Sequence, residues 1–439
     1  MSAQALASSQ TETYPVSSTQ ASLWAPSGSS AINVPAVLRL RGPLEQARLA
    51  ETLAALVGRH GALRTTLHSA PDGTPVQRVT AGGTLALDIL RHDATLPQAL
   101  PGLLLAGSER PFALAGEPLA RAELHAFGAQ DHLLMLWSHH IISDLASANV
   151  LVEEFKKLYA GEALGAVQCQ LAEFAIAERA ARASTEQRRF WTDNLRGADG
   201  RFAMPAVTSD QHLAIRPALP LLPPPVAQSL SRLAAARRTT LIAVFAAAVI
   251  ANHASAAATD RALIGLTMSN RDSARLRSTV GCLADQLPLV VDIDGDPTFG
   301  ELLDRVRAAL LDAYDHRLPL GVLRQFLTDQ QPPMFAVNLN FLPPRASIDP
   351  PVTTGRVRIE DVRFPYGIVK SRPDPWWAGD AVLAYRPRLD PAGLGGEIEG
   401  DATIHDFSTV AGHGQRFAAL LEQASQTLDI PLSRLAEAR

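Results

Sequence analysis

The first half of the chain carries regular patterns of apolar and polar residues that predict strands and helices. Residues 33–42 alternate apolar and polar side chains before a Gly-Pro pair, which indicates a strand, and residues 44–60 carry Leu and Ala at helical spacing. A Pro-Asp-Gly turn at 71–73 separates two short strands, and a third strand follows them. The pattern therefore predicts strand, helix and strands in that order.

A hairpin and further helices complete this half. The predicted strands at 119–127 and 132–138 are joined by a Gly-containing turn, and the second strand runs directly into a polar cluster. Helical spacing then returns at 145–158 and at 171–195. The first half therefore mixes strands and helices, which is typical of a layered α/β domain.

Gly and Pro are concentrated at 196–225, and we interpret this stretch as a domain boundary. It predicts one domain at 1–195 and a second at 196–439, each an α/β sandwich. No internal sequence repeat relates the two halves. The elements predicted in the second half are helices at 226–237, 239–256, 298–315, 319–327 and 408–427, and strands at 262–268, 286–294, 335–341 and near 357, 381 and 395.

The charge balance and the hydropathy exclude several classes of partner. The 439 residues hold 40 Lys plus Arg and 44 Asp plus Glu, for a net charge of -4, so no basic surplus suits nucleic acid or an anionic membrane. The apolar stretch at 241–251 falls short of the roughly 20 residues needed to span a bilayer. The N-terminus also lacks the features of a signal peptide. We expect a cytoplasmic protein with no nucleic-acid and no membrane partner.

Lysine and cysteine positions exclude two common kinds of site. None of the lysines, Lys156, Lys157 and Lys370, follows a glycine, so the chain has no P-loop. The two cysteines, Cys169 and Cys282, cannot form a disulfide framework, and no Cys/His spacing suggests zinc. We expect both cysteines to be buried and the chain to bind no metal.

The polar cluster at the end of the hairpin is the strongest candidate for chemistry. It reads Ser-His-His-Ile-Ile-Ser-Asp at 138–144, and Ser143 or Asp144 can cap the helix that follows. On a strand, His139 and His140 must point to opposite faces, and a neutral imidazole suits proton transfer near pH 7. Three alternatives stay open: histidines that only pack and cap, a metal site that lacks a second ligand cluster, and a serine hydrolase that lacks a GxSxG elbow.

The segment HHIISD at 139–144 resembles the HHxxxDG signature of condensation domains from nonribosomal peptide synthetases, which are relatives of chloramphenicol acetyltransferase. Further stretches resemble other family motifs in the same order along essentially the whole chain. These stretches are SSTQASLW (17–24), RHGALRTTL (59–67), FAIAERA with FWTDNLRG (190–197), MSNRDS with VGCLADQLPLVVDI (280–293), DHRLPLGVL (315–323) and PPMFAVNLNFL (332–342). The chain is thereby identified as a member of this family.

The resemblance implies an α/β fold of two chloramphenicol-acetyltransferase-like sandwich subdomains, arranged as a V with a central tunnel. The family's functional histidine corresponds to His140, which either takes a proton from the attacking amine or hydroxyl or positions that group. His139 is expected to pack on the other side of the strand. Asp144 is expected to hold the loop through an arginine, with Arg271 as the first candidate and Arg64 as the second.

The chain departs from the family pattern at three of these positions. Leu145 stands where the family has a glycine whose backbone N–H lies near the oxyanion, and a positive φ would be costly for leucine. Asp285 and Gln286 replace an Asn-Thr pair of the family. These differences predict an altered oxyanion geometry and an unusual acceptor preference.

Three other residues are candidates for the tunnel or the acceptor channel. Trp376 and Trp377 are adjacent in a Pro- and Gly-containing loop, and tryptophan is enriched at surfaces that meet partners. Ordinary loop packing explains them equally well. Asn338, within the last of the motifs, is the third candidate.

The resemblance implies a free-standing condensation enzyme of natural-product biosynthesis. It would transfer an acyl, polyketidyl or peptidyl chain from a carrier-protein thioester to an amine or hydroxyl, on a small molecule or a second carrier, and release the chain. It would bind no cofactor of its own, because the carrier protein supplies the phosphopantetheine, and it would be a monomer. The chain is similar to the ester-forming enzymes that release polyketides, as in enacyloxin assembly. Alternatives are an acyl-CoA-dependent O- or N-acyltransferase, a non-catalytic recruitment module and a chain epimerase.

Overall fold

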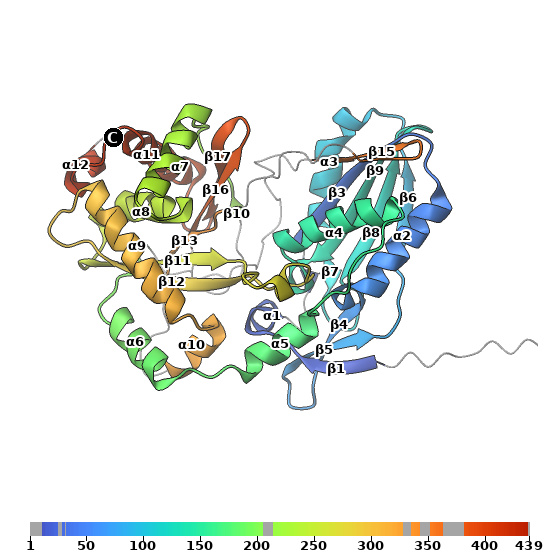
Figure 1. The fold of residues 1–439 in the computed structure, drawn as a ribbon, viewed down its shortest axis with the longest axis horizontal. Helices are drawn as coiled ribbons and strands as arrows, with labels where there is room; N and C mark the ends of the chain where they lie inside the picture. Colours follow the sequence, from blue (N-terminus) through green and yellow to red (C-terminus); the bar gives the residue numbers. More distant parts are fainter. Residues whose placement is uncertain are drawn as a thin grey trace, which may run out of the picture. The chain divides into compact units, whose positions relative to one another are not determined.

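The chain divides into two compact units, each with its own mixed sheet and helices (Figure 1). Unit 1 contains Met1–Ala181, Ser269–Ala284 and Ile348–Phe364; unit 2 contains Arg182–Met268, Asp285–Ser347 and Pro365–Arg439. The computed structural model describes residues 11–24, 29–30, 32–204, 214–327, 335–342, 352–362 and 382–437. The α/β character predicted from the sequence is confirmed in both units.

A six-stranded sheet forms the centre of unit 1. In order across the sheet, its strands are β14 (Val352–Thr354), β15 (Val357–Asp361), β3 (Asn33–Arg41), β9 (Asp131–His139), β8 (Ala120–Ala126) and β6 (Leu87–Arg91). The central strand β9 is antiparallel to both β3 and β8 and is buried on both faces almost from end to end. A strand covered on both faces reads as a continuous apolar run, which is the pattern of this segment.

Helices cover the faces of this sheet. They include α2 (Gln46–Arg59) and α4 (Leu145–Tyr159), which pack against each other, and α3 (Leu96–Glu109), which was not predicted from the sequence (Figure 1). Trp137 of β9 packs against Gly107 of α3, where a Cβ atom would lie only 2.1 Å from the indole. A glycine is therefore required for α3 to approach the sheet this closely.

Smaller elements complete unit 1. They are the sheet β1 (Thr11–Pro15), β5 (Pro75–Thr80) and β4 (Thr65–Ser69), the pair β2 (Ser29–Ser30) and β7 (Phe112–Ala113), the helices α1 (Ser18–Leu23) and α5 (Leu171–Ala180), and the short 3-10 helices η1 (Gly61–Arg64), η2 (His140–Ile142) and η4 (Ala274–Leu276). The side chains of Ser17 and Gln20 form a capping box at the start of α1. This local pairing explains why a helix begins within the first of the sequence motifs.

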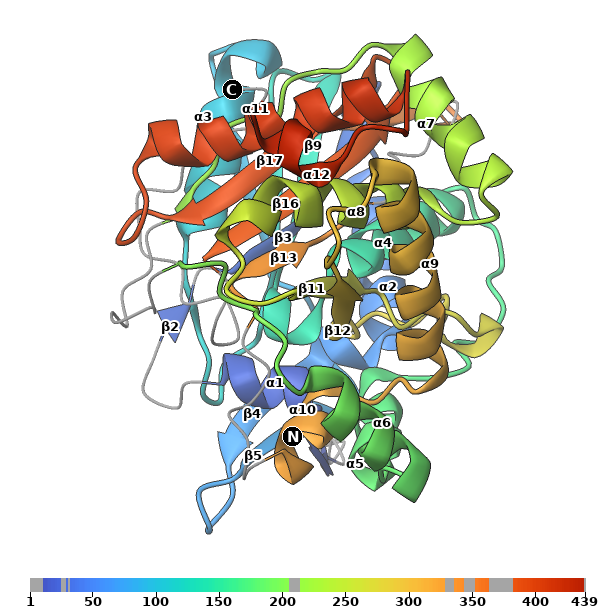
Figure 2. The ribbon, with the colours of Figure 1, turned by 90° about the vertical axis from the view of Figure 1, so that its left-hand side faces the viewer.

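Unit 2 has a six-stranded sheet of its own. In order, its strands are β10 (Ala214–Ile215), β17 (Gly393–Asp401), β16 (Leu383–Asp390), β13 (Val337–Leu339), β11 (Arg261–Met268) and β12 (Asp285–Asp292). Its helices are α6 (Thr185–Leu195), α7 (Pro224–Ala236), α8 (Leu241–His253), α9 (Phe299–Asp315), α10 (Leu320–Phe326), α11 (Phe407–Ala424) and α12 (Leu432–Glu437), with the 3-10 turn η3 (Ala254–Ala256). Figure 2 shows α7, α8, α9 and α11 lying over this sheet.

Helix α8 is apolar around its whole circumference, and its residues from Ala243 to Ala251 are buried in the core of unit 2. An all-apolar helix is typical of such a central position. Among the described residues, no single helix is long and apolar enough to cross a membrane. The pair α7 and α8, extended by η3, passes that test only when taken together, and it is bent by 104° at the break.

The two units do not follow the division predicted at residues 195 and 196. The chain leaves unit 1 after Ala181, because the helix predicted at 171–195 is two helices. A capping box formed by Ser184 and Gln187 begins the second helix, α6, after a short break. Two later segments then return to unit 1, and one of them adds β15 as an antiparallel strand beside β3.

A cluster of histidines lies between α8, α11 and β16 in unit 2. The His253 Nε2 atom is 2.8 Å from the Tyr385 hydroxyl, and the His253 ring stacks on His413 at 4.9 Å. Burial lowers the pKa of His253 well below its usual value. Burial, together with the nearby Arg416 and His405, lowers the pKa of His413 to about 4. Both imidazoles are therefore neutral in the folded protein near pH 7.

These lowered pKa values predict that unit 2 loses stability in mild acid. The unfolded chain takes up protons on both histidines near their ordinary pKa, so the stability present above that value is lost as the pH falls toward about 4. From about pH 7.5 to about pH 5 we expect the melting temperature to fall by at least about 2 °C, the equivalent of roughly 1 kcal/mol. The variant His413→Phe keeps an aromatic ring and should show a smaller fall by calorimetry. An equal fall in the variant would contradict this account.

Candidate functional site

The two adjacent histidines lie where β9 ends and η2 begins, so His139 is the last residue of the strand and His140 is the first of the 3-10 turn. The His139 N–H donates to the Leu119 carbonyl at 2.8 Å, and the His140 N–H donates to the Ile32 carbonyl at 2.8 Å. These bonds come from opposite neighbours of β9. These backbone hydrogen bonds hold both histidines in place independently of their side-chain contacts.

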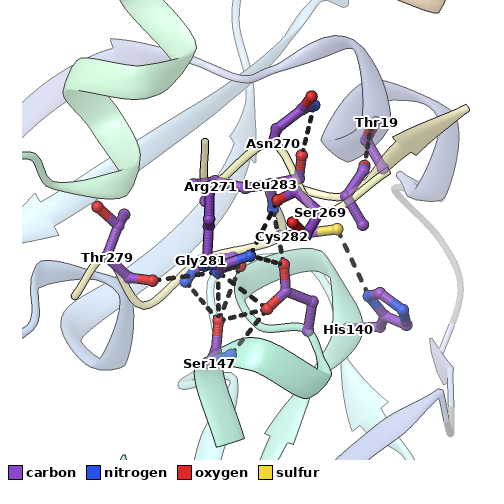
Figure 3. A network of polar contacts seen from close by, with 12 residues as sticks. Thr19, His140, Ser147, Ser269, Asn270, Arg271, Thr279, Gly281, Cys282 and Leu283 are labelled. Atoms are coloured by element: carbon purple, nitrogen blue, oxygen red, sulfur yellow. Dashed lines mark hydrogen bonds and ion pairs between the residues drawn. The ribbon is translucent and has the colours of Figure 1, made fainter. Parts of the chain in front are cut away.

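The two imidazole rings have different surroundings. His139 is fully buried, its Nδ1 atom accepts a hydrogen bond from the Ile141 N–H at 3.1 Å, and its ring meets Phe112 edge-on. His140 is only partly buried, and its Nδ1 atom lies 3.4 Å from the sulfur of Cys282 (Figure 3). His139 thus packs in the interior of unit 1, and His140 is the more exposed of the two histidines.

Asp144 is the N-cap residue of α4 and lies in an almost fully buried ion pair with Arg271. The guanidinium binds both carboxylate oxygens, with Nη1 2.7 Å from Oδ2 and Nη2 2.9 Å from Oδ1. The carboxylate also accepts hydrogen bonds from the Ser147 N–H at 2.8 Å and the Leu283 N–H at 3.2 Å. These donors occupy both carboxylate oxygens with charge-assisted hydrogen bonds, which favours a structural role for Asp144.

The partner of Asp144 is therefore the first of the two predicted arginines. Arg64, the second candidate, instead donates to backbone carbonyls of its own neighbourhood, with Nε 2.9 Å from the Val57 oxygen and Nη1 bonded to the Thr80 oxygen. The expectation that Arg64 holds the loop is wrong. The Arg64 side chain instead links the end of α2 to the end of β5, within unit 1.

Ser147 joins the ion pair to the segment that carries Arg271, and it was not among the residues predicted from the sequence. Its hydroxyl lies 2.8 Å from Asp144 Oδ1 and 2.9 Å from the Gly281 carbonyl, and it accepts from the Gly281 N–H at 3.0 Å (Figure 3). A Cβ atom on Gly281 would lie 2.7 Å from the Leu171 side chain, so the packing of this segment against α5 favours glycine. The available signal was the spacing of Ser147, three residues after the capping Asp144.

Further hydrogen bonds hold the segment Ser269–Ala284 against the rest of unit 1. The Thr279 hydroxyl donates to the Cys169 carbonyl at 2.7 Å. At the other end, the Thr19 hydroxyl of α1 donates to the Ala284 carbonyl at 3.1 Å. The segment is therefore fixed on both sides of Cys282, the residue that faces His140.

Leu145 does not take the positive φ that would strain a leucine. It is the first residue of α4, with helical backbone geometry, and 38% of its surface is exposed. The first N–H groups of an α-helix have no acceptor within the helix. The replacement of glycine by leucine therefore leaves a backbone donor at the N-terminus of α4.

Of the three remaining predicted residues, the structure describes Asn338. Asn338 lies on β13 of unit 2, fully buried, and its Oδ1 atom accepts a hydrogen bond from the Thr267 hydroxyl at 3.3 Å. Trp376 and Trp377 lie outside the described residues. Within the described ranges, no group of three or more His, Cys, Asp or Glu side chains could hold a metal ion.

The buried ion pair predicts a large stability effect at Asp144. The variant Asp144→Ala leaves the Arg271 charge buried without a partner, so we expect it to lower the free energy of unfolding by about 3 kcal/mol or more. The matched control is Asp131→Ala, which breaks the partly exposed pair with Arg39 and should cost about 1 kcal/mol or less. Urea denaturation measures both. A loss of activity in Asp144→Ala with unchanged stability would mean instead that Asp144 acts chemically.

Comparison with known proteins identifies the family. The family model described as "Condensation domain" matches residues 10–347. Tyrocidine synthase 3 from Brevibacillus parabrevis is 32% identical over 296 residues, which are 65% of this chain and 4% of that protein. The chain thus spans a small part of the length of this relative.

Solved structures share the fold. The complex of the X-domain and OxyB from teicoplanin biosynthesis matches with a TM-score of 0.78 and 24% identity, covering 97% of this chain and 96% of that chain. SgcC5 protein from Streptomyces globisporus matches with a TM-score of 0.76 and 22% identity, covering 95% of this chain and all of that chain. Condensation domains catalyse bond formation by acyl transfer in peptide synthetases. The resemblance predicted from the sequence motifs is confirmed: this chain belongs to the condensation-domain family.

Proposed function

We propose that the chain transfers an acyl, polyketidyl or peptidyl group from the phosphopantetheine thioester of a carrier protein to an amine or a hydroxyl. The placement of the histidines in the family motif carries this proposal. His140 is the partly exposed one, while His139 is enclosed and the Asp144 carboxylate is occupied by Arg271. Of these three side chains, His140 is therefore the one that we propose contacts the bound reactant.

The reaction assigns a task to His140 at each stage. As the acceptor nitrogen or oxygen attacks the thioester carbonyl, Nε2 of His140 takes its proton, or positions the acceptor for attack. The tetrahedral oxyanion needs a hydrogen-bond donor, and the N–H of Leu145 at the start of α4 is our candidate. Collapse of this intermediate breaks the carbon–sulfur bond. The departing thiolate then takes the proton back from the imidazolium, which restores His140.

The phosphopantetheine is part of the substrate in this reaction, because it is covalently attached to the carrier protein. Both amines and alcohols are proposed as acceptors, and SgcC5, which shares the fold, was solved in complex with a diol. The diol in that complex is our reason for keeping alcohols beside amines among the proposed acceptors. Chain release, action as a free-standing unit, a monomeric state and a cytoplasmic location stay predictions of the sequence.

A recruitment role is the second candidate, because the X-domain of the same fold was solved in complex with a protein, OxyB. A chain of this kind would bind its partner without transferring an acyl group. The intact pair of His140 and the anchored Asp144 favours catalysis over recruitment. The two candidate functions predict different effects of removing the His140 imidazole. Acyl transfer would be lost in a catalyst, and partner binding would be kept in a recruitment module.

The variant His140→Ala tests the catalytic proposal directly. We expect transfer from a loaded carrier protein to fall at least about 100-fold, the lower end of the contribution of general acid-base catalysis. Intact mass spectrometry of the carrier measures the loss of its acyl group. The control His68→Ala, in β4, should retain activity, and both variants should keep the melting temperature of the wild type. Turnover of His140→Ala within about tenfold of the wild type would refute the role given to His140.

A competition experiment separates the carrier-dependent reaction from an acyl-CoA-dependent one. The same acyl group is supplied as a carrier-protein thioester and as its CoA thioester, together with one amine and one alcohol acceptor. We expect kcat/KM to be at least about tenfold higher for the carrier-bound donor, because protein contacts add binding energy that CoA cannot supply. Equal or higher kcat/KM for CoA would assign the chain to the small-molecule acyltransferases instead.

A further inference from the structure

The thiol of Cys282 lies within hydrogen-bonding distance of the His140 ring, and the proposed function gives it no task. Its sulfur is 3.4 Å from Nδ1 of His140, and its side chain is completely buried (Figure 3). From the sequence, Cys282 was predicted only to be a buried residue within a motif. The contact joins positions 142 residues apart, so no local pattern indicates it.

The backbone on both sides of Cys282 is fixed to the ion-pair network. The preceding residue, Gly281, bonds to Ser147 through both its N–H and its carbonyl. The following residue, Leu283, donates its N–H to Asp144. Since Asp144 and Ser147 begin the helix that follows His140, the sulfur and the imidazole are held by one network. The contact between the sulfur and the imidazole is therefore fixed by the backbone hydrogen bonds on both sides of Cys282.

An imidazole engaged at one nitrogen has only the other available for proton transfer. A neutral histidine carries one N–H and one lone pair, and the partner of one nitrogen determines which form is populated. A thiol sulfur can accept a hydrogen bond, although weakly. If Nδ1–H points at the sulfur, the lone pair is on Nε2, which is the nitrogen that the proposed reaction uses.

We propose that Cys282 is a positioning residue for His140, whose sulfur accepts a hydrogen bond from Nδ1–H and thereby leaves Nε2 unprotonated and directed at the acceptor. This inference rests on the proposed function, which assigns the base to His140. It also gives Asp144 and Arg271 a specific task, because they hold the segment that carries the sulfur. When Nε2 takes up a proton, the same contact stabilises the imidazolium.

Cys282 is not proposed as an acyl acceptor. A thioester exchange would need the sulfur to approach the carbonyl carbon of the donor, whereas this thiol has no exposed surface and faces the imidazole. A nucleophilic cysteine needs access as well as a neighbouring base. Acylated Cys282 in a peptide digest after incubation with loaded carrier protein would overturn the positioning role.

The kinetic test compares Cys282→Ala and Cys282→Ser with Cys169→Ala. Cys169 is the matched control, because it is also a buried cysteine of unit 1, and its sulfur lies 3.6 Å from a backbone carbonyl rather than beside an imidazole. We expect Cys282→Ala to lower kcat about tenfold with little change in KM, a part of the general-base contribution. Serine should restore kcat to within about threefold, because its hydroxyl also accepts a hydrogen bond.

The pH profile adds a readout that a purely structural role would not move. Loss of the acceptor at Nδ1 makes the imidazolium less stable, so the acid limb of the kcat/KM profile should shift to lower pH in Cys282→Ala. The profile of Cys169→Ala should match the wild type. An unchanged kcat and an unchanged acid limb in Cys282→Ala would overturn the proposal.

A spectroscopic measurement tests the contact without any turnover. In protein labelled with nitrogen-15 histidine, the ring signals of His140, assigned with the variant His140→Gln, should show the Nδ1–H form. Cys282→Ala should show a mixture of both forms, and Cys169→Ala should not differ from the wild type. An Nε2–H form in the wild type would refute the proposal. If the wild type failed to use any carrier thioester, the proposed function would fail, while this spectrum would still decide the role of Cys282.

Discussion

The buried ion pair between Asp144 and Arg271 is the interaction on which the candidate site depends. Burying two charges is costly, and the cost is offset only when the geometry is good and the remaining donors and acceptors are satisfied. Here the guanidinium binds both carboxylate oxygens, and the N–H groups of Ser147 and Leu283 complete the shell. The pair therefore joins the start of α4 to a segment that arrives from much later in the chain.

The two adjacent histidines differ in their surroundings because the strand ends between them. The end of β9 places His139 in the core, where Ile141 and Phe112 enclose it. The next residue turns out of the strand into η2, so His140 is left partly exposed beside Cys282. Without the anchored segment, His140 would lose the sulfur that faces its Nδ1 atom. Asp144 thus acts on the proposed reaction through structure, in agreement with its lack of an accessible oxygen.

Membership of the condensation-domain family and the geometry of the site support different conclusions. The family bears on the type of reaction, and the geometry bears on the individual residues. The family supports the type of reaction that we propose, acyl transfer that forms a bond to an acceptor. The geometry shows how the surroundings of the motif residues differ, since His139 is enclosed and the Asp144 carboxylate is paired with Arg271. It also shows that Leu145 is accommodated as the first residue of a helix, so the departure from the family glycine causes no backbone strain.

Most elements of the fold could be predicted from periodicity, because a strand or helix with one or two buried faces repeats its apolar residues at a fixed interval. The strand β9 and the helices α2, α4 and α9 are examples. Helix α3 was missed because Pro101, Gly102 and Gly107 lie inside it, and proline and glycine disfavour a helix. The break between α5 and α6 was missed because both sides keep helical spacing. The break depends on the capping box at Ser184, a short polar signal within a helical pattern.

The sequence by itself determined the α/β class, the position of the two histidines at a strand end, a helix cap at Ser143 or Asp144, and the family. Each of these is encoded by residues close together in the chain. Only the tertiary structure decided that Arg271 and not Arg64 pairs with Asp144, that two late segments return to unit 1, and that Cys282 meets His140. Those contacts join residues more than 100 positions apart. Local spacing carries no information about such contacts, because they form only when the sheet and its helices are packed.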